Sequence, residues 1–197
     1  MYELKFDFAT KDDLKNIMDL LYDTEYYPNA EWGIGTSSDH KERIEYLFNS
    51  KFLNRFSPDN ILVCKSNDEF VGFVLFLRGN KIKQLTVKSE ILLLPHLNFI
   101  PRIKFVFLML TYIIFYKECN ADEFYISNIS LDPKFRGLSL SQPIMDYCYK
   151  IALKDGFSKV ALHANNESLV SFYKKLGFII SNFKDNKMTK NIWFNTQ

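Results

Sequence analysis

The segment that constrains this fold most begins at residue 127. It predicts a strand, a short loop up to about residue 141, and a helix after it. The residues read SNISLDPKFRGLSLS, in which an apolar β-type run ends at Asp-Pro and is followed by Arg-Gly. Proline is tolerated in the first turn of a helix, so Pro143 predicts a helix that begins near Ser141 or Gln142. Unpaired N–H groups and the helix dipole at such a start favour a phosphate or pyrophosphate ligand.

A second motif, FYKKLGF at residues 172–178, follows the first. Together the two motifs resemble those of the GNAT superfamily of CoA-dependent N-acyltransferases. In that family the loop reads Arg-Gly-x-Gly-x-Gly or Ala, and its amides hold the pyrophosphate of CoA. Here Ser139 and Ser141 occupy the second and third small positions. A serine either hinders close approach of the phosphates or supplies hydroxyl donors to them, and Ser141 is also a candidate N-cap.

The resemblance also implies a mechanism, in which an amine attacks the thioester of acyl-CoA directly. Two neighbouring strands would splay apart, so that the pantetheine arm pairs with strand backbone as though adding a strand. Tyr173 matches the family's general acid, which protonates the departing thiolate. The acyl-CoA contacts implied by the resemblance are Ile129, Ser130, Leu131, Arg136, Gly137, Leu138, Ser139, Leu140, Ser141, Asn166 and Tyr173.

The order of predicted elements agrees with this family. A chain of 197 residues with 47% hydrophobic content suits one globular domain over residues 1–197. We expect an α/β fold of GNAT type, with three α/β/α layers and a mixed, mostly antiparallel central sheet that splays between its fourth and fifth strands. Periodicity and capping signals place strands at 1–8, 61–64, 71–77, 124–131, 159–164 and 188–194, and helices from Thr10, from Asp39, from Ser141 to Gly156, and at 167–176.

Charge and cysteine content restrict the possible partners. A formal net charge of +2 gives no bulk electrostatic case for nucleic acid. Cys64, Cys119 and Cys148 are odd in number and widely spaced, which indicates core thiols and a reducing compartment. The first residues read as a strand and not as a signal peptide, so we expect a cytoplasmic location. The histidines are dispersed without ligand spacing, and we expect no metal.

The general base is less well defined than the general acid. His163 is the first candidate, because its ordinary pKa lies near neutrality. A histidine on a strand is also commonly a packed residue with no chemical role. Glu123 and Tyr125, on the neighbouring predicted strand, are alternatives.

A hydrophobic and predominantly helical insertion is expected at about residues 81–120. Its apolar run from Phe105 to Tyr116 is too short for a membrane span, which needs about 20 residues. The simplest interpretation is a buried helix. Alternatives are a subunit interface over residues 91–116, a wall for a long apolar substrate, or a peripheral membrane contact. A monomer and a homodimer both remain open.

The acceptor site is expected between the first two helices, where family members commonly shape the acceptor pocket. Glu31 is a candidate partner for a cationic amine, and Trp32 lies beside it. The alternative for Glu31 is a solvated loop acid, and an aromatic residue in a loop often only covers the core.

The leading hypothesis is therefore an acyltransferase that moves acetyl from acetyl-CoA, its acyl-donor substrate, to a primary amine of a small molecule or peptide. Two further classes stay open. One is a catalytically silent GNAT-like module that binds CoA or a partner, and the other is a transferase for longer acyl chains.

Overall fold

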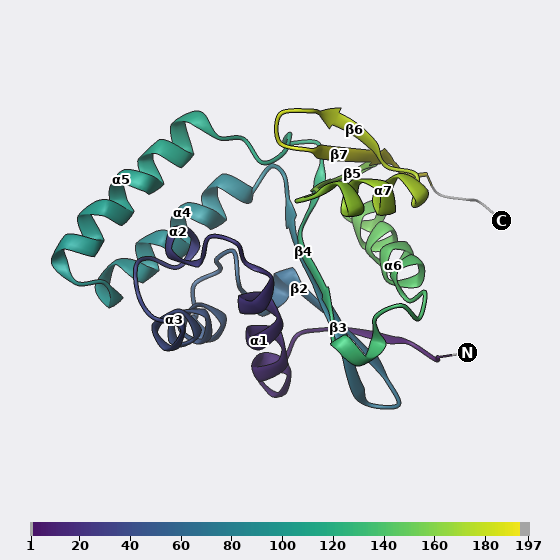
Figure 1. Ribbon diagram of the computed structural model, residues 1–197, viewed down its shortest axis with the longest axis horizontal. Coiled ribbons are helices and arrows are strands. Elements are labelled where there is room, and N and C mark those ends of the chain that lie inside the picture. The colour runs from purple at the N-terminus through teal and green to yellow at the C-terminus, as the bar shows by residue number, and fades with distance from the viewer. Residues whose placement is uncertain (1, 194–197) are drawn as a thin grey trace.

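The computed structural model describes residues 2–193, and within them seven strands form one mixed sheet (Figure 1). The strand order is β1-β2-β3-β4-β5-β7-β6, and every neighbouring pair is antiparallel except β4–β5, which is parallel. The strands are β1 (Lys5–Phe8), β2 (Ile61–Ser66), β3 (Glu69–Arg78), β4 (Phe124–Leu131), β5 (Lys159–His163), β6 (Ile179–Asn182) and β7 (Lys187–Asn191).

Helices cover both faces of this sheet (Figure 1). One group packs on the first face, and α6 and α7 pack on the other. The helices are α1 (Leu14–Thr24), α2 (Pro28–Glu31), α3 (Ser37–Asn49), α4 (Ile82–Leu93), α5 (Phe99–Phe115), α6 (Ser141–Lys154) and α7 (Glu167–Lys175). The expected three layers and mixed sheet are confirmed.

Side-chain alternation along the strands explains how one sheet serves two cores. On β2, Ile61 and Val63 face α1 and α3, whereas Leu62 and Cys64 face α6. Because both faces are covered, the central strands read as nearly continuous apolar runs, and β3 is buried over almost all of its length. The three cysteines are buried free thiols, as predicted.

The sheet parts between β4 and β5, as expected. The two strands pair at only three positions, the last of which joins Ile126 to Leu162, although β4 continues to Leu131. At the same point the register between β3 and β4 shifts, which leaves Ser127 as an extra residue in β4. A bulge of this kind bends a strand and increases its twist. The edge of β4 beyond Ile126 therefore has no partner strand on this side.

Several element boundaries differ from the sequence prediction. The second helix begins at Ser37 and not at Asp39, because Thr36 is its N-cap and Asp39 completes a capping box with it. Strand β6 was not predicted, since four residues directly after a helix give too short a pattern. The last strand ends at Asn191, and Phe194, which we had placed in it, lies outside the described residues, as does Met1.

The insertion between β3 and β4 forms α4 and α5, but the prediction of a buried helix is wrong for α5. Phe105 is the one buried residue of α5, and most of the other apolar side chains are exposed. The sheet face is already covered by α1, α3 and α4, so α5 can pack against α4 along only a narrow stripe. Within residues 2–193, no helix combines the length and apolar composition that a membrane span requires.

Candidate active site

The loop after β4 has the backbone that the glycine-rich family motif predicts. Asp132 begins it by accepting a hydrogen bond from the Lys134 amide at 3.0 Å. Gly137 has a φ of +78° and Ser139 a φ of +58°, both in the left-handed region. Glycine enters this region freely, whereas a residue with a Cβ does so at a cost of about 1 kcal/mol. Ser139 therefore adopts, at this cost, a backbone conformation that glycine takes freely.

Helix α6 starts directly behind this loop. It begins at Ser141, as predicted, with Pro143 in its first turn. The prediction of Ser141 as N-cap is wrong: the N-cap is Leu140, and no side chain caps the helix. Among the described residues, no backbone amide from Gly137 to Leu140 donates a hydrogen bond within the chain. The loop thus presents backbone amides without an internal partner, next to the positive end of a 14-residue helix.

Beyond Ile126, β4 and β5 are separated by a gap. The edge of β4 that is unpaired there presents every second residue's backbone groups to this gap. The amide of Asp132 donates to Val71 on β3 at 2.9 Å, so the backbone groups of Ser130 also face β3. Those of Ile129 and Leu131 consequently face the gap. Arg136 confirms the direction, because its Nε donates to the carbonyl oxygen of Leu131 at 3.0 Å from that side.

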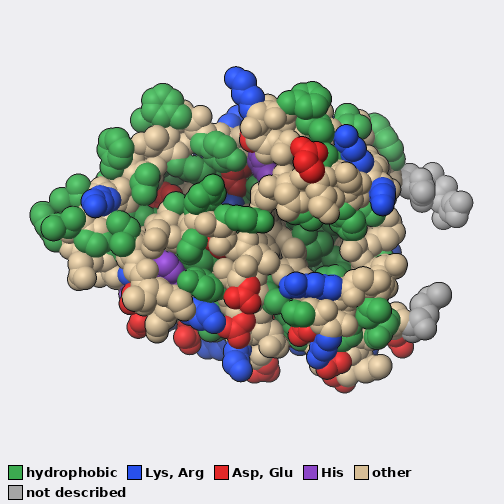
Figure 2. Space-filling model, in the orientation of Figure 1, with side chains coloured by type: hydrophobic (Ala, Val, Ile, Leu, Met, Phe, Trp, Pro, Cys, Tyr) green, Lys and Arg blue, Asp and Glu red, His purple; other side chains and the backbone are tan. Residues whose placement is uncertain are grey.

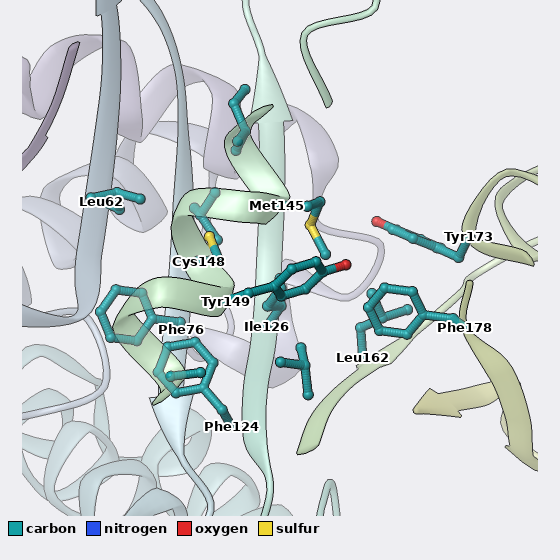
Figure 3. Close-up of a cluster of buried hydrophobic side chains, with 14 of the residues drawn as sticks. Leu62, Phe76, Phe124, Ile126, Met145, Cys148, Tyr149, Leu162, Tyr173 and Phe178 are labelled. Atoms are coloured by element: carbon teal, nitrogen blue, oxygen red, sulfur yellow. The ribbon is translucent and has the colours of Figure 1, made fainter. Parts of the chain in front are cut away.

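Tyr173 lies on α7, beyond the end of β5, and belongs to the core packed under α6. Figure 3 shows its ring crossing from α7 with the hydroxyl directed towards Met145. It is 6% exposed, and burial raises the pKa of Tyr173 to about 12. The phenol therefore stays protonated at neutral pH. Asn166 is the N-cap of α7, where its Oδ1 accepts from the Leu169 amide at 2.9 Å.

A cavity of about 950 Å³ lies on the opposite side of the gap, between α1, α2, α4, α5, the middle of β4 and the end of β5. Its wall includes Ser127 and Asn128, which follow the last paired residue of β4. It also includes Ala164 and Asn165, which follow β5. The cavity therefore reaches the point where the two strands part.

The cavity wall carries mostly acidic charge. Five acids line it, and the one cation among the described lining residues, apart from His163, is Arg55. Arg55 is buried and forms a bidentate pair with Glu118, at 2.7 and 2.8 Å. Tyr112 also donates to Glu118, and Arg55 donates to Ser127 Oγ at 2.7 Å. The five acids are Glu25, Glu31, Glu90, Glu118 and Asp185.

Two of these acids are poorly neutralised. The Glu31 carboxylate lies 3.6 Å from Arg55 Nε, and about a third of its side chain, 34%, remains accessible. Burial raises the pKa of Glu31 to about 7 despite the nearby Arg55, and burial together with Glu31 raises the pKa of Glu90 to about 7. Glu90 Oε2 is buried without a hydrogen-bond partner in the described residues. A cation entering the cavity would relieve this excess of negative charge.

His163 faces the cavity between Tyr125, with which it forms a hydrogen bond, and the carboxylate of Asp185. Its Nδ1 lies 2.9 Å from Tyr125 Oη, and its Nε2 lies 3.4 Å from Asp185 Oδ2. The carboxylate favours a proton on Nε2, which leaves Nδ1 to accept from the Tyr125 hydroxyl. Burial lowers the pKa of His163, although Asp185 opposes this shift. The imidazole is thus neutral at physiological pH.

The remaining predicted residues have different surroundings. Trp32 lines the cavity but is fully buried, packed among Tyr22, His40 and Phe56. Glu123 lies away from this cavity and pairs with Lys187 at 2.6 Å. Although burial opposes it, the Lys187 hydrogen bond holds the pKa of Glu123 below its usual range.

Sequence reasoning missed Arg55, Glu118, Glu90 and Asp185, which come from four separate segments and carry no motif. No spacing or periodicity in the sequence marks any of the four. Within residues 2–193, no three or more His, Cys, Asp or Glu side chains are grouped to hold a metal ion.

A parallel strand pair that parts halfway, with a loop of free amides at one end of the gap, is the architecture of a CoA-dependent acyltransferase. The chain belongs to the acetyltransferase (GNAT) family, whose sequence model matches residues 16–178. No sequence among the curated proteins matches this chain.

Solved structures share the fold at low identity. An N-acetyltransferase from Staphylococcus aureus Mu50 is 19% identical, with a TM-score of 0.69, and the match covers 94% of this chain and 100% of that one. The PaiA N-acetyltransferase of Thermoplasma acidophilum, solved in complex with coenzyme A, is 16% identical with a TM-score of 0.55, covering 96% and 99%. A polyamine N-acetyltransferase of Drosophila melanogaster, which forms N-acetylagmatine, is 12% identical with a TM-score of 0.54, covering 96% and 100%.

Proposed function

We propose that this protein transfers acetyl from acetyl-CoA to a primary amine of a small cationic molecule. The observation that supports the proposal most strongly is the acidic cavity that reaches the parting point of β4 and β5. A thioester held in the gap would meet an ammonium ion held in the cavity. Two distant relatives of the same fold, the PaiA enzyme with its coenzyme A and the polyamine enzyme, are consistent with such a pair of substrates.

The donor site fits this proposal. Free amides from Gly137 to Leu140, the start of α6 and the exposed Arg136 would bind the pyrophosphate. The gap-facing backbone of Ile129 and Leu131 would pair with the pantetheine arm. The backbone of Ser130, which the resemblance had also implied, faces β3 and would not pair with it. The Ile129 amide would then polarise the thioester carbonyl.

Proton transfer from the amine is assigned to Tyr125 and His163. The ammonium would give a proton to Tyr125 Oη as the Tyr125 proton moves to His163 Nδ1, 2.9 Å away. Asp185 would stabilise the resulting imidazolium across 3.4 Å. The free amine attacks the thioester carbon, and Tyr173, a protonated phenol at neutral pH, gives its proton to the departing thiolate as the C–S bond breaks. The second proton on the attacking nitrogen passes to solvent, which in turn reprotonates Tyr173.

Calorimetric titration with acetyl-CoA tests the donor site. We expect binding in the wild type and about ten-fold weaker binding in Arg136→Ala, because the guanidinium fork is lost from an exposed loop. Unchanged affinity in the variant would remove Arg136 from the site. Binding without turnover of any amine would support the silent-module alternative, and a preference for longer acyl-CoA would support the long-chain alternative.

Glu31 is expected to set the affinity for a cationic acceptor. Its pKa of about 7 means that it is neutral at lower pH and charged at higher pH. The KM for an ammonium substrate should therefore fall as pH rises through 7, and Glu31→Gln should weaken this dependence and raise KM about ten-fold at pH 8. Glu90, which also has a raised pKa of about 7, would account for the dependence that is left. Steady-state kinetics between pH 6 and 8 measure this, with Glu25→Gln at the cavity rim for comparison. A KM at pH 8 that Glu31→Gln leaves unchanged would contradict the assignment.

His163 is expected to give the acid limb of the pH-rate profile. A base must be neutral, so kcat/KM should fall as pH drops through the lowered pKa of His163, below its ordinary 6.5. His163→Gln should lose this limb and about 100-fold in rate. The loss should be much smaller with a weakly basic amine, which is already deprotonated. An equal loss with both amines would indicate a structural role only.

A further inference from the structure

Helix α5 exposes a continuous apolar face. Ile100, Ile103, Phe107, Leu110 and Ile114 follow one another at intervals of three and four residues, and all are exposed. Phe107 is 69% exposed and Phe115, at the end of the helix, 81%. In Figure 1, α5 lies at the edge of the molecule, and Figure 2 shows hydrophobic side chains gathered over the same edge.

The exposed charges of the insertion that carries this face have one sign. All six lysine and arginine side chains between residues 81 and 117 are exposed. The two acids in or directly after this stretch, Glu90 and Glu118, line the cavity. The insertion itself thus exposes basic side chains and no acid. The six basic residues are Lys81, Lys83, Lys88, Arg102, Lys104 and Lys117.

We propose that the exposed face of α5, with its rim of lysine and arginine residues, is a docking surface for an anionic phospholipid bilayer. The apolar residues would enter the boundary between headgroups and acyl chains, and the basic side chains would meet the negative headgroups. Lys104, on the exposed side of α5, can extend its charge to the headgroups from a long apolar stem.

The rim charge favours a membrane over a second copy of this chain. In a two-fold symmetric dimer the same surface meets itself, so a basic rim would oppose a basic rim. Like charges placed together disfavour association, whereas an anionic lipid surface attracts them. Docking would also hold the cavity close to lipid, because Met109 and Tyr112 on the inner side of α5 line it.

Co-sedimentation with vesicles tests this proposal without any acyl transfer. We expect binding to phosphatidylcholine vesicles that contain about 30% phosphatidylserine to be at least ten-fold tighter than to phosphatidylcholine alone, and weaker at high salt. Equal binding to both vesicles, or no binding to either, would overturn the proposal. A dimer by analytical ultracentrifugation that Phe107→Ser dissociates, together with no vesicle binding, would identify a second copy as the occupant.

Matched variants separate the two contributions. Phe107→Ser with Ile114→Ser should reduce binding at least ten-fold, whereas Phe183→Ser, an equally exposed aromatic residue between β6 and β7, should not. Lys88→Gln with Lys104→Gln should reduce binding to the anionic vesicles alone, whereas Lys150→Gln with Lys154→Gln on α6 should not. Because all these side chains are exposed, the variants should fold, which circular dichroism checks. Equal losses in the variants and their controls would contradict docking through α5.

Discussion

Replacing Tyr173 with Phe should lower kcat by about 100-fold or more while leaving the affinity for acetyl-CoA nearly unchanged. The substitution removes one hydroxyl and keeps the ring that packs against Phe178. Without the phenol, the thiolate would have to leave unprotonated or wait for water, and a positioned general acid contributes about 10²–10⁴-fold. Single-turnover kinetics and calorimetric titration of the same variant measure the two quantities.

Tyr149→Phe is the matched control for this prediction. Tyr149 belongs to the same core cluster (Figure 3), and its hydroxyl is buried without a hydrogen-bond partner in the described residues. Burial raises the pKa of both phenols, so neither ionises near physiological pH and the two side chains differ only in position. Loss of the Tyr149 hydroxyl should leave kcat unchanged. If the two variants behave alike, Tyr173 serves packing and not proton transfer.

Replacing Glu118 with Ala should lower the free energy of unfolding by about 3–5 kcal/mol. Arg55 is 7% exposed, and Glu118 holds it through two hydrogen bonds at 2.7 and 2.8 Å. Removing one partner of a buried pair leaves the other charge uncompensated, which costs far more than the pair itself contributes. Burial alone would lower the pKa of Arg55, but Glu118 and Glu31 outweigh it and raise that pKa, so Arg55 stays charged. Equilibrium unfolding in urea measures the loss.

Two further variants distinguish this cause from a general loss of contacts. Arg55→Met combined with Glu118→Leu should recover most of the stability, since neither member of the buried pair is left without its partner. Glu69→Ala, which breaks the exposed ion pair with Lys134, should leave the unfolding transition unchanged. A double variant as unstable as Glu118→Ala would show that lost packing, and not the unpaired charge, is responsible.

The local parts of the fold could be predicted from the sequence because their signals are local. Pro143 placed the start of α6, and the capping box of Thr10 with Asp13 placed the start of the first helical segment. The two motifs indicated the family and the strand pair that parts. Even Ser139, which departs from the family motif, takes the left-handed backbone of the glycine it replaces.

The acidic cavity, which we propose binds the acceptor, could not be predicted in the same way. Glu31 was expected to face an amine, but its partner Arg55 and the neighbouring Glu118 and Glu90 come from segments far apart in the chain. No periodicity or spacing relates such residues, because only packing of the insertion against the first helices brings them together. The group of Tyr125, His163 and Asp185 likewise forms only when β5 and the turn before β7 are in place.

The sequence by itself determined the family, the order of the main elements and the strand-loop-helix corner before α6, since each depends on residues close together along the chain. Only the tertiary structure decided that the apolar run of α5 faces outward. The outward orientation results because α1, α3 and α4 already cover that face of the sheet. The hydrophobicity of one segment carries no information about how much sheet surface the other helices leave uncovered.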